Sequence, residues 1–199
     1  MNNTGGSNNY GHVSDKLLRR YSDIGCKTML DIGCGIGMNV AYANEMYGYD
    51  AWGIEGDPEC EPHKLTKNFI LHDFENDGFL DKNKLPHEEF DLVYCVVVSE
   101  HIEDSANEQF MDALTLGKWI VFTWCEPGYP GFHHVNCQLP EYWIPKFESR
   151  GYKYLADKSR DVKQCPLFMY KQPWWRGQQY NQKQVRKPYL RDWGMVFKR

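Results

Sequence analysis

Short apolar runs alternate with amphipathic segments along the chain up to residue 123. The apolar runs are rich in β-branched residues and stop at glycine or polar residues, which is typical of buried strands. Between them, apolar side chains recur at helical spacing. The predicted strands are residues 28–32, 51–55, 69–72, 90–98 and 118–123, and the predicted helices are residues 14–21, 39–46 and 106–116.

Strands that alternate with helices pair in parallel, because each crossover carries a helix that covers the sheet. The pattern breaks at residues 124–139, a loop rich in proline and glycine. Three more elements are predicted after it: a helix over residues 140–150 and closing strands over residues 152–156 and 194–198. We therefore predict one α/β domain over residues 13–199, built on a doubly wound, mostly parallel sheet.

Two segments fall outside this pattern. Residues 1–12 are polar and rich in Asn and Gly, and they predict a flexible tail. Residues 157–193 form a basic, aromatic insert or lid between the last two strands, and the aromatic and basic side chains in it include Trp174, Trp175, Arg176 and Tyr180. Arginine and tryptophan together suit stacking on bases or sugar rings, although the same residues could cover a ligand as packed aromatics.

Charge is distributed unevenly along the chain. The net charge is −4, yet residues 146–199 contain 14 Lys and Arg against 4 Asp and Glu. We favour the interpretation that two oppositely charged parts of one fold attract each other. A basic face for an anionic substrate is the alternative.

Hydrophobic residues make up 42% of the 199-residue chain, which is enough for one well-packed core. No apolar run is long enough to cross a bilayer, and the first residues lack a signal-peptide pattern, so we expect a cytoplasmic protein without membrane association. The seven cysteines are scattered, as small buried hydrophobes are. Cys125, His133, His134 and Cys137 could supply four ligands to an ion, but we interpret their proximity in sequence as chance and expect no metal.

The candidate ligand site begins at the turn after the first strand. Gly33, Gly35 and Gly37 alternate directly before a helix, where glycine lets the backbone approach a ligand and the helix offers free N–H groups. A dinucleotide fingerprint would need a third glycine where Met38 stands. Asp31 precedes the turn and would repel a pyrophosphate but attract a cation. The turn therefore favours S-adenosylmethionine, with its ammonium and sulfonium groups, over NAD.

Acidic residues follow the next two strands. Glu55, beside Gly56, ends the second strand, where a carboxylate can accept hydrogen bonds from both ribose hydroxyls. Asp73 follows the third strand, where it could accept the adenine amino group while Phe74 packs beside the ring. A surface glutamate is the plainer alternative for Glu55, and Glu75 and Asp77 compete with Asp73 for its role.

These residues together resemble the class I family of S-adenosylmethionine-dependent methyltransferases. The glycine-rich motif of the family is matched by residues 31–37, which include Cys34, and its fourth motif by residues 90–102, FDLVYCVVVSEHI. The resemblance implies a Rossmann-like seven-stranded sheet in the order 3-2-1-4-5-7-6, with the seventh strand antiparallel. We also assign Cys95 and Val96, in the fourth motif, to the cofactor site.

The acceptor of the methyl group should face the residues that follow the fourth and fifth strands. Among these, His133 and His134 are the candidate catalytic bases, because histidine titrates near neutrality. His101 is interpreted as a structural residue or part of the pocket wall, and a nucleophilic role for Cys125 or Cys137 is disfavoured because nothing nearby marks a thiolate.

The preferred function is methyl transfer to oxygen or nitrogen of a small molecule or sugar. An RNA-directed enzyme that uses the basic insert is the first alternative, so nucleic acid is a possible but not a favoured partner. A non-catalytic module that binds S-adenosylmethionine is the second alternative.

Overall fold

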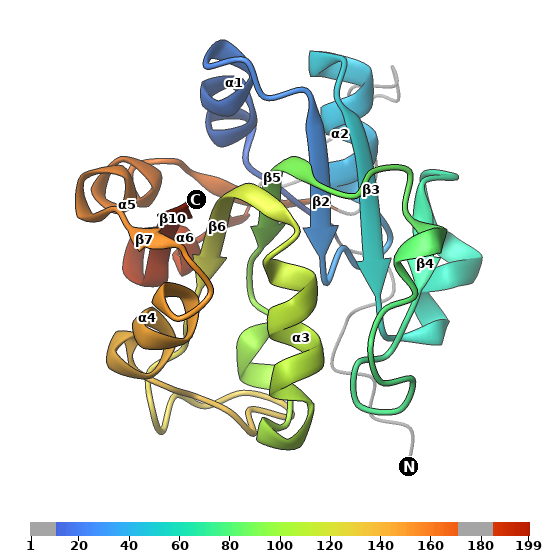
Figure 1. Ribbon diagram of the computed structural model, residues 1–199. Helices are drawn as coiled ribbons and strands as arrows, with labels where there is room; N and C mark the ends of the chain where they lie inside the picture. The colour runs from blue at the N-terminus through green and yellow to red at the C-terminus, as the bar shows by residue number, and fades with distance from the viewer. Residues whose placement is uncertain (1–10, 171–184) are drawn as a thin grey trace.

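The computed structural model describes residues 11–170 and 185–199 (Figure 1). Its main sheet consists of β2 (Thr28–Ile32), β3 (Asp50–Glu55), β4 (Phe69–Leu71), β5 (Phe90–Cys95), β6 (Gly117–Thr123), β7 (Lys153–Tyr154) and β10 (Gly194–Lys198). The seven strands lie in the order β4-β3-β2-β5-β6-β10-β7. The strands from β4 to β6 are parallel, and β10 is antiparallel to both β6 and β7. The predicted α/β class with a seven-stranded, mostly parallel sheet is confirmed.

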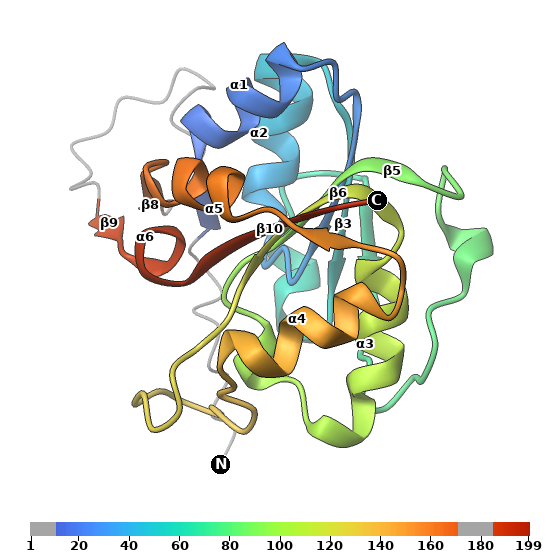
Figure 2. The ribbon, with the colours of Figure 1, turned by 60° about the vertical axis from the view of Figure 1, so that its left-hand side comes forward.

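Helices cover both faces of this sheet and make three layers (Figures 1 and 2). One face packs against α1 (Asp15–Asp23), α2 (Met38–Tyr47), α5 (Ala156–Lys163) and α6 (Tyr189–Trp193). The other face packs against α3 (Asn107–Leu114) and α4 (Pro140–Glu148), through large side chains such as Phe110 and Trp143. Four short 3-10 helices complete the connections: η1 (Pro58–His63), η2 (Lys82–Lys84), η3 (Ser99–His101) and η4 (Asp104–Ala106). Apolar residues on both faces of the sheet explain why its strands are apolar almost throughout.

A second, three-stranded sheet was not predicted. It consists of β1 (Gly11–Val13), β8 (Leu167–Tyr170) and β9 (Val185–Lys187), in the order β1-β8-β9 and antiparallel throughout. The predicted end of the tail at residue 12 is therefore wrong, because β1 already belongs to the folded protein. Gly11 suits this place, since a Cβ there would lie 2.2 Å from Cβ of Met38 in α2.

Within the predicted insert, 157–193, the described residues contribute most of α5, both β8 and β9, and α6. The side chains that motivated a stacking surface or lid, Trp174, Trp175, Arg176 and Tyr180, lie outside the described residues. Among the residues described, no helix combines the length and apolar character needed to span a membrane.

One strand boundary differs from the prediction in a way that matters for the site. The apolar run 90–98 predicts a single strand, but β5 ends at Cys95. Val97 has a left-handed backbone with φ of 63°, and its N–H donates to Oγ1 of Thr123 at 2.9 Å. The chain thus leaves the sheet early and turns across its edge, although the residues remain apolar.

Candidate active site

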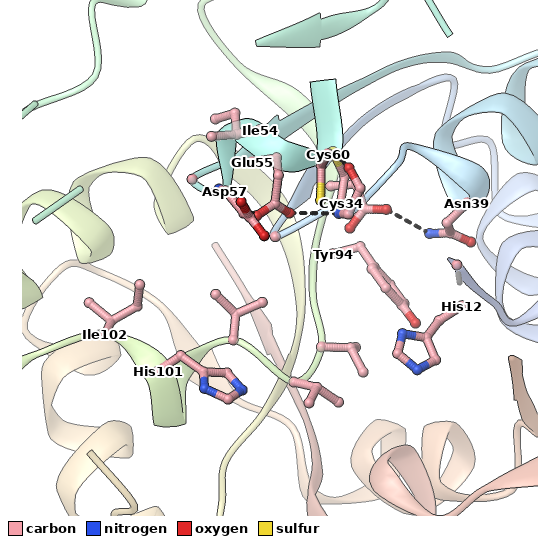
Figure 3. Close-up of a pocket in the computed structure, with 18 of the residues that line it drawn as sticks. His12, Cys34, Asn39, Ile54, Glu55, Asp57, Cys60, Tyr94, His101 and Ile102 are labelled. Carbon is pink, nitrogen blue, oxygen red and sulfur yellow. Dashed lines mark hydrogen bonds between the residues drawn. The ribbon is translucent and has the colours of Figure 1, made fainter. Parts of the chain in front are cut away.

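A cavity of about 520 Å³ opens at the carboxyl ends of β2, β3, β4 and β5 (Figure 3). This is the edge at which ligands of open α/β sheets bind, and the volume is within the range of about 300–1,000 Å³ for small-molecule sites. Of the residues assigned to the cofactor from the sequence, nine line the cavity: Asp31, Gly33, Cys34, Gly35, Glu55, Gly56, Asp73, Phe74 and Val96. Gly37 and Cys95 are not among the lining residues.

The glycine turn forms one wall of the cavity. Gly33, Gly35 and Gly37 have φ of 74°, 55° and 74°, a left-handed region that favours glycine. A Cβ on Gly33 would lie 2.2 Å from Cγ2 of Val98, so a larger residue here would clash with this side chain, which also lines the cavity. Gly37 caps the start of α2 and acts in the turn, away from the cavity surface. Its assignment to the cofactor site stays a prediction, and the structure shows its role in the turn.

Asp31 lies at the base of the cavity and is only 3% exposed. Its Oδ2 accepts from Nδ2 of Asn39 at 3.2 Å (Figure 3). Burial raises the pKa of this carboxyl to about 7, because few charges or donors offset the loss of water. Two more polar atoms that belong to lining residues are buried without a hydrogen-bond partner among the described residues: Oδ1 of Asn39 and the hydroxyl of Tyr94. Buried polar atoms are usually paired, so this end of the cavity suits a ligand with donors and positive charge.

Glu55 braces the glycine turn from the end of β3. Its Oε2 accepts from the N–H of Gly35 at 2.7 Å, and its Oε1 accepts from the N–H of Asp57 at 3.0 Å. Burial raises the pKa of Glu55, and these two backbone donors act against that rise. The carboxylate therefore has a fixed position at the cavity wall (Figure 3).

The adenine-side candidates lie just past β4. Asp73 accepts from the N–H of Glu75 at 2.9 Å and from Nδ2 of Asn76 at 2.6 Å, so it also organises the following turn. Phe74 is buried and packs edge-on against Phe110. Asp73 and Phe74 both line the cavity.

The lining residues have a one-sided charge. They include four carboxylates, those of Asp31, Glu55, Asp57 and Asp73, and among the described lining residues there is no lysine or arginine. A pyrophosphate would find no cation to pair with in this lining, whereas a cationic ligand would be attracted. The acidic lining therefore supports a cationic ligand, which the sequence indicated from Asp31 alone.

Cys95 is the other assigned residue that does not line the cavity. Successive side chains of a strand point to opposite faces. Tyr94 belongs to the core on the α1 and α2 face and also lines the cavity, whereas Cys95 is fully buried in the core on the α3 and α4 face. Cys95 is therefore a core residue, and Val96, beyond the strand end, reaches the cavity.

The two candidate bases have different surroundings. His133 is exposed and lines the cavity beside Phe132. His134 is not a lining residue, and its Nδ1 lies 3.8 Å from Sγ of Cys125 and 3.7 Å from Sγ of Cys137. The two adjacent side chains thus point in different directions, and of the two candidate bases only His133 lines the cavity.

His101 also lines the cavity, from the far side relative to Asn39 (Figure 3). Its Nδ1 donates to the backbone carbonyl of His133 at 3.1 Å, which places the lone pair of the neutral ring on Nε2. Burial lowers the pKa of His101, and the neighbouring His134 and His133 lower it further, while hydrogen bonds to the backbone of His133 and Phe132 act against this shift. The ring is therefore held neutral and can accept a proton at physiological pH.

Backbone strain is concentrated at this wall. Val97 and His133 have φ of 63° and 51°, and they are the only non-glycine residues with positive φ in the described chain. Both line the cavity. Such conformations cost of order 1–3 kcal/mol and cluster at functional sites.

The sequence did not identify several lining residues: His12, Asn39, Tyr94 and Tyr189. Asn39 was recognisable, because it lies two positions after Gly37 in the first turn of the helix. His12 and Tyr189 come from opposite ends of the chain, and their rings pack edge-on with centroids 5.9 Å apart. No local pattern could have paired them.

The family model for a methyltransferase domain matches residues 9–158. The chain therefore belongs to the methyltransferase family. The strand arrangement of its main sheet and its glycine turn are those of the class I, S-adenosylmethionine-dependent methyltransferases. A search of curated proteins gave no match.

Solved structures share the fold. A SAM-dependent methyltransferase from Archaeoglobus fulgidus is 24% identical, with 69% of this chain and 67% of that chain covered and a TM-score of 0.52. The small RNA methyltransferase HEN1 is 14% identical, with 92% of this chain and 26% of that one covered and a TM-score of 0.54. A third structure, described under the conversion of a disulfide bond into a thioacetal group during echinomycin biosynthesis, is 14% identical. It covers 98% of this chain and 85% of its own, with a TM-score of 0.62.

Proposed function

We propose that this methyltransferase acts on an oxygen or nitrogen atom of a small molecule or sugar, and that His101 orients or deprotonates the acceptor. The observation that carries the proposal is the arrangement of the cavity. One end has carboxylates and unpaired polar atoms without lysine or arginine among the described lining residues, and the other has an imidazole held neutral.

The residues at the acidic end fit S-adenosylmethionine. Asp31, Asn39 and Tyr94 would hold its ammonium-bearing part, because they offer a carboxylate and two unpaired oxygen atoms. Glu55 would accept from the ribose, and Asp73 with Phe74 would hold the adenine. When bound, the cofactor supplies an electrophilic methyl group on a sulfonium.

The acceptor would bind beside Val97 and His133, and the aromatic side chain of Phe132 also lines the cavity. His101 then takes the acceptor's proton on Nε2, while its Nδ1 stays bonded to the carbonyl of His133. His133 is the second candidate, since it lines the same wall but is exposed. Positioning alone accounts for much of the rate in such reactions, and a general base typically adds about 10²- to 10⁴-fold.

The test combines binding with labelling. Calorimetry should show S-adenosylmethionine binding that is lost in Asp31→Ala and Glu55→Ala, and no tight binding of NAD. A radiolabelled methyl donor is then offered to small-molecule, glycan, RNA and protein fractions of a lysate. We expect label in the small-molecule or glycan fraction.

Substitutions at histidine locate the base. His101→Ala should lower kcat by about a hundredfold or more while cofactor affinity stays the same, and His63→Ala, outside the cavity lining, is the matched control. The acid limb of the wild-type pH profile should lie below the ordinary histidine pKa of about 6.5, because burial lowers the pKa of His101.

Each contrary result has a defined meaning. NAD binding in place of S-adenosylmethionine would overturn the cofactor assignment. Label that enters only RNA would refute the proposed acceptor and support the RNA-directed alternative. Binding without transfer to any fraction would support the non-catalytic alternative.

A further inference from the structure

Three potential metal ligands meet in the loop that follows β6. Sγ of Cys125, Nδ1 of His134 and Sγ of Cys137 all lie within 4.8 Å of one another. The sulfur atoms lie 3.8 and 3.7 Å from the imidazole nitrogen. The loop has no helix or strand between Thr123 and Pro140, so local secondary structure does not explain this convergence.

These distances match those of a tetrahedral zinc site. With Zn–S of about 2.3 Å and Zn–N of about 2.0–2.1 Å, sulfur and nitrogen ligands at the tetrahedral angle lie about 3.6 Å apart. The observed distances from the two sulfur atoms to Nδ1 of His134 are 3.8 and 3.7 Å, close to this value. The ligands are thus close to their final positions before any ion binds.

The type of ligand selects the ion. Two thiols and one imidazole suit zinc, whereas magnesium and calcium prefer oxygen. Cys125 is buried, and His134 and Cys137 are half-buried, so the cluster is shielded but reachable.

A buried carboxylate lies beside the cluster. The ligand atoms of Glu100, His101 and His134 also lie within 4.8 Å of one another. Glu100 is 3% exposed, and its Oε2 has no hydrogen-bond partner among the residues described. Such an atom is unfavourable unless a cation or donor approaches it.

We propose that Cys125, His134 and Cys137 bind one zinc ion, with the fourth position open on the side of Glu100. Three protein ligands with an open fourth position are known for zinc. Binding forms two Zn–S bonds and one Zn–N bond, and releases the two thiol protons to solvent. In the metal-free protein the Nδ1 of His134 donates to the carbonyl of Tyr129 at 3.1 Å, and on binding this proton moves to Nε2.

The ion would fix the loop that forms the acceptor wall. The N–H groups of Val135 and Asn136 already donate to the backbone carbonyl of Glu100, at 2.9 and 3.1 Å. Zinc adds a link from the end of β6 through Cys125 to both His134 and Cys137. This inference does not depend on the identity of the acceptor.

The test measures metal directly. The full chain is purified under reducing conditions, stripped with a chelator and titrated with zinc against a chromophoric competitor, and its metal content is measured by mass spectrometry. We expect one zinc per chain. Cys137→Ser and His134→Ala should weaken zinc at least about a hundredfold, since even outer partners of a metal site are often worth ten- to a hundredfold.

Matched controls separate ligation from folding. Cys165→Ser removes a buried thiol elsewhere, and His133→Ala removes the adjacent imidazole, so both should retain wild-type zinc affinity. If Cys125→Ser does not fold, cobalt(II) in the wild-type protein provides a second measurement, because thiolate ligands give charge-transfer absorption that Cys137→Ser should reduce.

Three results would overturn the proposal. One is a reduced wild-type protein that takes up no zinc. Another is equal affinity in the cluster variants and the controls. The third is a Cys125–Cys137 disulfide that forms in the purified protein, with no zinc binding after its reduction.

Discussion

Asp31→Asn should stabilise the cofactor-free protein at pH 8 while weakening S-adenosylmethionine. The carboxyl is 3% exposed, and the side chain of Asn39 is its hydrogen-bond donor. Burial of this acid therefore disfavours the charged form in the absence of a cationic ligand. The variant keeps the shape and one oxygen acceptor but removes the charge.

The magnitude follows from the pKa. Burial raises the pKa of Asp31 from 3.8 to about 7, and one unit corresponds to about 1.4 kcal/mol, so the ionised folded state is disfavoured by about 4 kcal/mol. The new amide N–H₂ group lacks a partner and returns about 1–2 kcal/mol of that gain. We expect a net increase of about 2–3 kcal/mol in the free energy of unfolding at pH 8.

The pH dependence has a defined sign. Between about pH 4 and 7 the folded protein holds a proton on Asp31 that the unfolded chain has lost, so stability falls as pH rises through this window. Glu100, whose pKa burial raises to about 7, acts in the same direction. Asp31→Asn should therefore flatten the decline without abolishing it.

Urea unfolding at pH 5 and pH 8 measures the stability, and calorimetry measures the affinity. Loss of a hydrogen bond to a charged group, about 1.5–3 kcal/mol, predicts cofactor binding that is roughly ten- to a hundredfold weaker. The exposed Asp23→Asn, at the end of α1, should change neither quantity. A variant that is less stable than wild type at pH 8, or that binds the cofactor normally, would refute the reasoning.

Two further predictions concern the same cavity. In urea unfolding, Gly33→Ala should cost about 2–4 kcal/mol of stability, because a left-handed φ is combined with a Cβ that would lie 2.2 Å from Val98. Gly48→Ala has a similar φ but open space around the new Cβ, so this control should show the backbone cost alone. Equal losses in the two variants would contradict the close approach at Gly33. Tyr94→Phe should leave thermal stability unchanged or slightly higher, since its hydroxyl is buried without a partner among the described residues, and should weaken the cofactor in calorimetry. A large loss of stability would show that this hydroxyl has a structural partner.

Local patterns predicted the main sheet and the glycine turn, because both depend on residues that are close in sequence. The turn needs glycine at positions with positive φ, and the strands need continuous apolar runs. The small sheet could not be predicted in this way. Its pairing joins Gly11 to Tyr170, and a three-residue strand gains its stability from such distant partners.

The apolar run 90–98 shows a different limit. Composition predicts that it continues as strand to Val98, yet the hydrogen bond from Val97 to Thr123 turns the backbone after Cys95. This turn brings Val97 and Val98 to the cavity. Composition identified the apolar character of these residues, whereas their role came from a bond to a neighbouring strand.

The loop after β6 links the two proposals physically. His133 adopts a left-handed φ of 51°, and the reversal lets its side chain line the cavity while that of His134 approaches the two thiols. Its carbonyl accepts from Nδ1 of His101, so the same residue that separates the two histidines also orients the candidate base. An ion on His134 would hold the preceding peptide bond in place, and through the carbonyl of His133 it would hold the tautomer and position of His101. The left-handed backbone at His133 is therefore explained by the need to direct its own side chain to the cavity and that of His134 to the two thiols.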